Sequence, residues 1–99
     1  MHPYKAVIIG GGPSGHSAAV RIAQLGGKVA LVEKDFVGGI CTNWGCTPSK
    51  SMIESAKVAQ IVREAEKYGI DVPEFKVDFN KVALRRDQVI LKTRQFITD

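Results

Sequence analysis

The feature that most constrains this chain is a glycine-rich loop, Gly-Gly-Gly-Pro-Ser-Gly, at residues 10–15. It follows the run Ala-Val-Ile-Ile at residues 6–9, whose β-branched members predict a buried strand. It precedes a helical pattern over residues 16–25, which ends at a pair of glycines. A second apolar run at residues 29–32 predicts another buried strand, and a strand–helix–strand unit this short requires parallel strands. The predicted fold class is therefore α/β, with a βαβ unit over residues 1–35.

Three glycines in this loop follow the spacing G-x-G-x-x-G, which suits a dinucleotide pyrophosphate. Gly10 permits the tight turn, Gly12 lets a phosphate approach the backbone, and Gly15 allows the helix to pack closely on the strand. The pyrophosphate then lies on the free N–H groups at the start of the helix. Glu33 follows about 20 residues later, where a carboxylate can accept hydrogen bonds from a ribose. The pattern predicts a dinucleotide without distinguishing FAD from NAD, and a plain turn is the alternative interpretation.

Two cysteines, Cys41 and Cys46, lie in the segment Cys-Thr-Asn-Trp-Gly-Cys-Thr-Pro-Ser-Lys. Their spacing is neither a redox C-x-x-C nor a zinc-knuckle pair, and His2 and His16 lie far from a ligand spacing, so no metal site is expected. In a regular helix, residues five apart have Cα atoms about 8.6 Å apart. A disulfide needs a separation below about 7 Å. The two cysteines can therefore form a bridge only if the backbone departs from a regular helix.

The residues around Cys46 favour a reactive thiol. Gly45 and Pro48 predict the departure from a regular helix, since proline suits a first turn and cannot continue a helix from upstream. A cysteine at such a helix start has its thiolate stabilised by the helix dipole, and Lys50 adds positive charge nearby. The pattern predicts a reversible disulfide, and a pair of inert buried thiols is the other interpretation.

The rest of the chain predicts a loop and two long helices. We expect a loop over residues 36–42, a helix over about 46–67, and a last helix over about 79–97 with Asp78 as its N-cap. A two-column apolar stripe on the last helix is predicted to pack on a partner element; it comprises Val82, Ala83, Val89, Ile90, Phe96 and Ile97.

Charge and hydropathy exclude several classes of partner. The net charge is +4, and the one dense basic stretch, residues 81–94, carries Asp87 and no aromatic ladder, so we expect a solvated helix face and no nucleic acid. Its basic members are Lys81, Arg85, Arg86, Lys92 and Arg94. No apolar run approaches the roughly 20 residues of a membrane span, and no signal or transit pattern precedes the first strand. We expect a cytoplasmic location, where a disulfide is more often catalytic than structural.

Together these motifs resemble those of the class I pyridine nucleotide–disulfide oxidoreductases, FAD flavoproteins that exchange electrons between a nicotinamide and a cysteine pair. The resemblance rests on the glycine cradle, Glu33 and the run over residues 38–50, and it spans almost the whole chain. Pro-Ser-Lys at residues 48–50 and the segment 77–92 resemble dihydrolipoamide dehydrogenases in particular. Mercuric and glutathione-type reductases are alternatives, as is a non-catalytic FAD-binding module. The chain departs from the family at Ile40, where Thr is usual, and at Trp44, where a smaller residue is common.

The resemblance implies a role for each matching residue. Cys46 would lie against the flavin as the charge-transfer thiolate, and Cys41 would exchange with the substrate, so these two are the predicted catalytic residues. The predicted cofactor-binding residues are Gly10, Gly12, Pro13, Ser14, Gly15, Glu33, Lys34, Gly39, Cys41, Cys46 and Lys50. The implied reaction converts dihydrolipoamide and NAD⁺ to lipoamide and NADH through FAD.

The chain lacks parts that full-length relatives of this kind carry. It has no second G-x-G-x-x-G for a nicotinamide and no C-terminal interface domain, and two parallel strands alone make a poor sheet. We therefore expect an incomplete FAD-binding domain that is inactive alone, with a cradle at 1–35, a redox loop and helix at 36–68, and a linker and last helix at 69–99. NAD would bind to a domain absent from this chain. The full-length protein is expected to be a homodimer that acts on a lipoyl-bearing substrate or a small disulfide.

Overall fold

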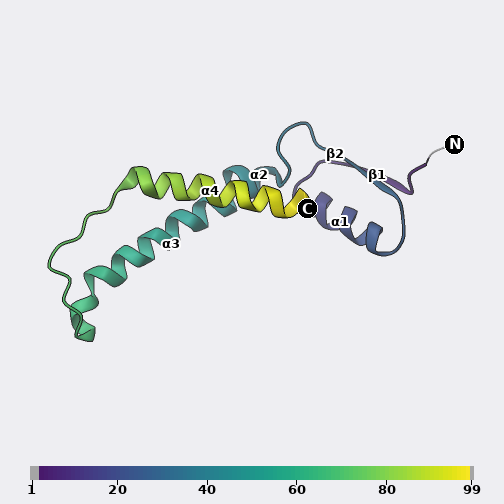
Figure 1. Ribbon diagram of the computed structural model, residues 1–99. Coiled ribbons are helices and arrows are strands. Elements are labelled where there is room, and N and C mark those ends of the chain that lie inside the picture. The colour runs from purple at the N-terminus through teal and green to yellow at the C-terminus, as the bar shows by residue number, and fades with distance from the viewer. Residues whose placement is uncertain (1–2, 99) are drawn as a thin grey trace.

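A computed structural model describes residues 3–98 and contains the predicted βαβ unit (Figure 1). Strand β1 (Ala6–Ile9) leads through the glycine loop into helix α1 (Pro13–Gln24), and strand β2 (Val29–Val32) follows. The two strands are parallel, with Ala6 opposite Val29 and Ile9 opposite Val32. This register confirms the α/β class and places the glycine loop at the carboxyl ends of both strands, where parallel sheets bind ligands.

Helix α1 covers one face of the two-stranded sheet and leaves the other face open. The Ile8 side chain points toward α1, because a Cβ added at Gly15 would lie 3.3 Å from it. Val7 and Ile9 point the opposite way, and Ile9 is 89% exposed. The prediction that both strands are buried is therefore wrong for this outer face, since α1 packs on one side and no other described element covers the second.

The redox segment is more helical than the sequence predicted. Residues 39–44 form a short helix, α2 (Gly39–Trp44), where a loop was expected over residues 36–42. Helix α3 (Cys46–Arg63) follows and ends earlier than predicted. Glu64 leaves the helical path, and the chain tightens into a 3₁₀ turn, η1 (Ala65–Tyr68), since the last turn of a helix often takes this form.

The last helix, α4 (Phe79–Thr98), begins where the sequence predicted. The Oδ1 atom of Asp78 accepts hydrogen bonds from the backbone N–H groups of Asn80 and Lys81, at 3.1 and 3.3 Å. These contacts satisfy donors in the first turn that have no partner within the helix. Asp78 is therefore the N-cap that the sequence indicated.

Helices α3 and α4 lie side by side and give the molecule an elongated shape (Figure 1). Its extents are 70 × 25 × 17 Å, and its radius of gyration of 19.7 Å exceeds the about 13 Å of a compact domain of this length. Ala65 and Ile90 are the buried apolar residues among those described. The α4 stripe is thus covered only in part: Ile90 is buried, whereas Phe96 is 82% exposed. No helix in the described range is long and apolar enough to cross a bilayer.

Candidate active site: a glycine cradle beside a disulfide

The glycine cradle consists of the loop at residues 10–12 and the first turn of α1. Gly12 is its N-cap residue, with φ −74° and ψ −175°, and Pro13 occupies the first turn. No side chain of the described residues caps this helix end. The uncapped first turn leaves backbone N–H groups for an anion, which the positive end of the helix dipole also favours.

The glycines of this loop differ in the space around them. A Cβ added at Gly15 would lie 2.0 Å from the carbonyl oxygen of Gly10, so only glycine allows α1 to pack this closely on the strand. A Cβ added at Gly12 would meet nothing nearer than the Gly39 Cα at 3.9 Å. Packing of α1 on the strand therefore requires glycine at position 15, whereas nothing within the described chain requires glycine at position 12. The space beside Gly12 could admit a ligand phosphate, and this role stays a prediction.

Glu33 lies beside the same loop, just after β2. Its Oε2 atom accepts a hydrogen bond from the backbone N–H of Gly11, and its Oε1 atom accepts one from the backbone N–H of Asp35 at 3.3 Å. The sequence did not predict the contact with Gly11. A carboxylate offers about four acceptor positions, so two remain for ribose hydroxyls. Lys34, the next predicted contact, is exposed.

The redox segment packs directly on the cradle. The backbone N–H of Gly38 donates to the carbonyl oxygen of Gly11 at 2.7 Å. Gly39 has φ +64°, and a Cβ there would lie 2.9 Å from the Gly12 Cα. The glycine at position 39 therefore lets two backbones touch, and the two predicted motifs form one continuous site.

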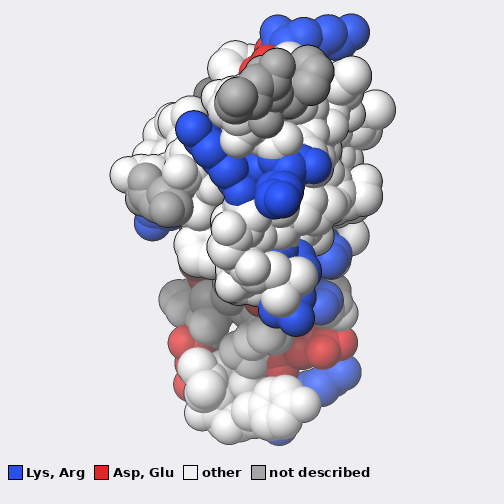
Figure 2. All heavy atoms as spheres, turned by 90° about the vertical axis from the view of Figure 1, so that its right-hand side faces the viewer, with Lys and Arg blue, Asp and Glu red and all other residues white. Residues whose placement is uncertain are grey.

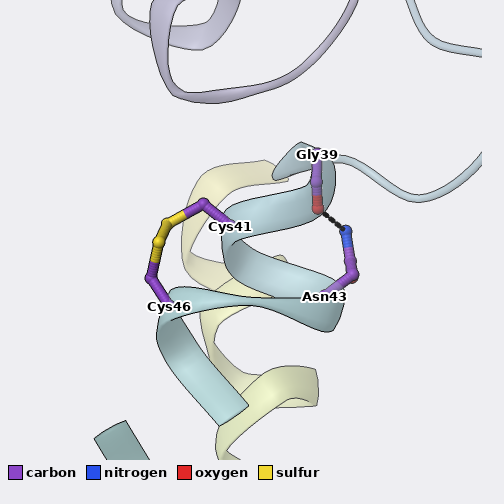
Figure 3. Close-up of a disulfide and its surroundings, with 4 residues drawn as sticks. All are labelled: Gly39, Cys41, Asn43 and Cys46. Carbon is purple, nitrogen blue, oxygen red and sulfur yellow. Dashed lines mark hydrogen bonds between the residues drawn. A yellow bond between two sulfur atoms is a disulfide. The ribbon is translucent and has the colours of Figure 1, made fainter. Parts of the chain in front are cut away.

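Cys41 and Cys46 form a disulfide at the junction of α2 and α3 (Figure 3). Their Cα atoms are 4.6 Å apart, because Gly45 breaks the helical path with φ −127° and ψ −101°. This break confirms the departure from a regular helix that Gly45 and Pro48 predicted. Cys41 is half-buried, while Cys46 is exposed as the first residue of α3.

Two arginines of the basic stretch contact the redox segment, which corrects the prediction of a purely solvated helix face. Arg85 Nη1 donates to the Oγ atom of buried Ser51 at 3.0 Å. Arg94 Nε donates to the Oδ1 atom of Asn43, which lies between the two cysteines in the sequence. On the face shown in Figure 2, the Lys and Arg side chains form separate groups with uncharged atoms between them. Arg86 pairs with its exposed neighbour Asp87.

With a glycine cradle and a disulfide in one site, the profile of the pyridine nucleotide-disulphide oxidoreductases matches residues 4–97 of the chain. The chain belongs to this family. It is 47% identical over 88 residues to a protein of Acholeplasma laidlawii and 45% identical over 95 residues to one of Zymomonas mobilis, both named dihydrolipoyl dehydrogenase. These matches cover 88% and 96% of the chain but 26% and 19% of the relatives. The chain thus spans about a quarter or less of their length.

A solved structure of the same kind supports the fold. The chain matches the HOCl-induced flavoprotein disulfide reductase RclA from Escherichia coli, determined as a Cu(II) complex, with a TM-score of 0.70 and 32% identity. The match covers 99% of this chain and 19% of that one. The resemblance to flavoprotein disulfide oxidoreductases, and to dihydrolipoyl dehydrogenases among them, is therefore confirmed.

Both departures from the family pattern lie on the surface of α2. Ile40 is exposed, so the methyl-rich side chain there fills no core position. Trp44 is 58% exposed and lines a hollow of about 490 Å³ between α2, α3 and α4, together with Pro48 and Leu91.

In residues 3–98 no group of three His, Cys, Asp or Glu side chains could hold a metal ion, and His2 lies outside that range.

Proposed function

We propose that the full-length protein containing this chain is an FAD-dependent dihydrolipoamide dehydrogenase. The observation that carries the proposal is the disulfide between Cys41 and Cys46, which lies in a segment packed directly on a dinucleotide-type glycine cradle. A cofactor on the cradle and a thiol pair beside it are the two parts that electron transfer between thiols and a flavin requires. Relatives named dihydrolipoyl dehydrogenase support the choice of substrate.

The residues present fit FAD. The uncapped start of α1 and the open side of Gly12 suit a pyrophosphate, and Glu33 has acceptor positions left for the ribose. The proposed contact set is Gly10, Gly12, Pro13, Ser14, Gly15, Glu33, Lys34, Gly39, Cys41, Cys46 and Lys50. When bound, FAD would supply a two-electron acceptor for the reduced cysteine pair and an electron donor for NAD⁺.

The cysteines carry the thiol chemistry. One thiolate of dihydrolipoamide attacks the Cys41 sulfur, the Cys41–Cys46 bond breaks, and Cys46 leaves as a thiolate that the start of α3 stabilises. The second substrate thiolate then attacks the substrate sulfur of this mixed disulfide and releases Cys41. The substrate becomes a disulfide and loses two electrons, and the cysteine pair becomes a dithiol and gains them.

The remaining parts of the enzyme lie beyond these 99 residues in this proposal. The chain is the N-terminal part of the FAD-binding domain, and NAD binds to a separate domain. The open outer face of β1 and β2 supports this assignment, because Val7 and Ile9 have no covering layer among the described residues. The proposed enzyme is a homodimer and works in the cytoplasm, where a reversible disulfide is more often catalytic than structural.

The substrate assignment is tested on the purified full-length protein. We expect it to be yellow and to reduce NAD⁺ with dihydrolipoamide, measured as NADH absorbance. Mercuric ion and glutathione disulfide, each with NADPH, serve as competing substrates. Turnover of either one without turnover of dihydrolipoamide would overturn the proposal, and bound FAD without any turnover would indicate a non-catalytic module.

Glu33 provides a separate test of the cradle. Glu33→Gln keeps the shape but removes the charge, and a hydrogen bond to a charged group contributes about 1.5–3 kcal/mol. We expect the FAD affinity of the full-length apoprotein to fall about tenfold, measured by flavin fluorescence during titration. Asp35→Asn removes a charge two residues away on an exposed side chain and serves as the control. Equal losses in both variants would mean that Glu33 acts only through net charge.

A further inference from the structure

Asn43 is a buried residue of α2 whose side chain links this helix to the loop before it, within the redox segment (residues 36–51). It is 3% exposed, and its Nδ2 atom lies 2.9, 3.1 and 3.4 Å from the carbonyl oxygens of Gly39, Val37 and Phe36. Two N–H hydrogens are thus shared among three acceptors at the entrance of α2. Figure 3 shows the contact with Gly39 on one side of α2 and the disulfide on the other. The same short helix therefore carries Cys41 and the amide that anchors its backbone.

Arg94 reaches this amide from α4, 51 residues further along the chain. Its Nε atom donates to Asn43 Oδ1, and its guanidinium carbon lies 3.7 Å from the centroid of the Phe36 ring. The planar guanidinium thus stacks on an aromatic ring and donates to an amide at once, a combination that lysine does not provide. Arg94 contacts the redox segment at both of these points.

The contact with Arg94 fixes the direction of the Asn43 amide. If the amide were reversed, its oxygen would face three carbonyl oxygens and its NH₂ group would face the guanidinium donors. Both sets of contacts would be repulsive. Arg94 therefore favours the single orientation in which Asn43 can donate to the loop.

From this geometry we propose that Arg94 is a positioning residue for the redox disulfide. Through Asn43 and Phe36 it keeps α2 docked in the place where Cys41 faces Cys46 across the break at Gly45. A docked α2 raises the effective concentration of one thiol at the other, which favours the disulfide over the dithiol. The catalytic consequence of this inference rests on the proposed function, but the disulfide equilibrium is a property of the thiols themselves.

The test measures that equilibrium in the full-length protein. Wild-type and variant proteins are equilibrated in buffers of defined dithiothreitol redox ratio, and free thiols are trapped by alkylation and counted by mass spectrometry. Arg94→Met retains the apolar stem and removes the donors and the charge. We expect it to weaken the Cys41–Cys46 disulfide about tenfold, which corresponds to about 30 mV. Arg86→Met is the matched control, since Arg86 lies on the same helix and pairs with exposed Asp87; we expect less than a twofold change.

A purely stabilising arginine gives a different result. If Arg94 were such a residue, Arg94→Met would lower the thermal unfolding midpoint equally in the oxidised and reduced protein and leave the redox equilibrium unchanged, which would overturn the inference. Asn43→Ser should weaken the disulfide at least as much as Arg94→Met, and the double variant should weaken it by less than the product of the two single effects, because both residues act on the same docking of α2. Independent, multiplying effects would contradict that route.

Two further arms keep the outcomes distinct. If Arg94→Met does not fold, Arg94→Lys decides: it keeps the charge without the stacked plane and should weaken the disulfide about threefold, whereas a wild-type equilibrium overturns the inference. The measurement needs neither lipoamide nor NAD⁺. A shifted equilibrium in a protein without dehydrogenase activity overturns only the proposed function, and an active dehydrogenase with an unshifted equilibrium overturns only the role of Arg94.

Discussion

Replacing either cysteine by serine should reduce dihydrolipoamide oxidation by the full-length protein about 10³-fold or more. The reason is that the exchange with substrate requires both sulfurs: one to form the mixed disulfide and one to leave. The cofactor should remain bound in both variants, because the proposed pyrophosphate contacts lie in the loop before α1 and at the start of that helix, and serine keeps nearly the size of cysteine. Activity is measured as NADH formation, and FAD content as absorbance of the purified protein.

The two cysteine variants should differ in their spectra. Cys41→Ser leaves the exposed thiol of Cys46 at the start of α3, where the helix dipole stabilises its thiolate, and should show long-wavelength charge-transfer absorbance with bound FAD. Cys46→Ser should not. Ser49→Ala, in the exposed first turn of α3, is the control and should keep activity within about twofold. The reverse pattern of absorbance would exchange the proposed roles of the two cysteines.

Local constraints explain what the sequence predicted well. The break at Gly45 and the cap at Asp78 each depend on a few adjacent residues, whose backbone preferences hold in almost any surroundings. The same is true of the turn from β1 into α1, where a Cβ at Gly15 would collide with the Gly10 carbonyl. Features of this type can be predicted from adjacent residues without knowledge of the tertiary structure.

Contacts between distant segments explain what the sequence did not predict. Arg94 and Asn43 are 51 residues apart, and Arg85 and Ser51 are 34 apart, so no local pattern joins them. The dense basic stretch therefore led to the prediction that these arginines lie on a solvated helix face. The helical state of residues 39–42 was missed for a related reason: Gly38 and Gly39, which indicate a loop, have positive φ values where the chain enters α2 and touches the cradle.

The open face of the sheet shows a limit of a different kind. An unbroken apolar strand predicts burial on both sides, and this is sound for a complete parallel sheet. The described residues supply a helix for one side only, and Ile9 remains 89% exposed. The described residues therefore do not supply the second covering layer that the sequence pattern of β1 predicts.

Gly12→Ala should weaken FAD binding without destabilising the apoprotein, whereas Gly15→Ala should destabilise the apoprotein itself. Gly12→Ala adds a Cβ that lies 3.9 Å from its nearest neighbour, the Gly39 Cα, at a φ of −74° that any residue can adopt. The apoprotein should keep its stability within about 0.5 kcal/mol. FAD affinity should fall about 100-fold, or about 2.7 kcal/mol, because the added methyl group occupies the space that a pyrophosphate needs. Affinity is measured by flavin fluorescence titration of the full-length apoprotein, and stability by urea unfolding without cofactor.

Gly15→Ala should instead destabilise the apoprotein itself, at the upper end of about 1–3 kcal/mol or beyond, since the new Cβ would lie 2.0 Å from the Gly10 oxygen. That oxygen belongs to the backbone, so relief requires α1 to move away from β1. Ser17→Ala, on the exposed side of α1, should change neither quantity appreciably. If Gly12→Ala lowered apoprotein stability as much as Gly15→Ala, the loop would need glycine at both positions for its own turn. Glycine at position 12 would then not indicate a ligand, and only Glu33 and the start of α1 would point to a dinucleotide.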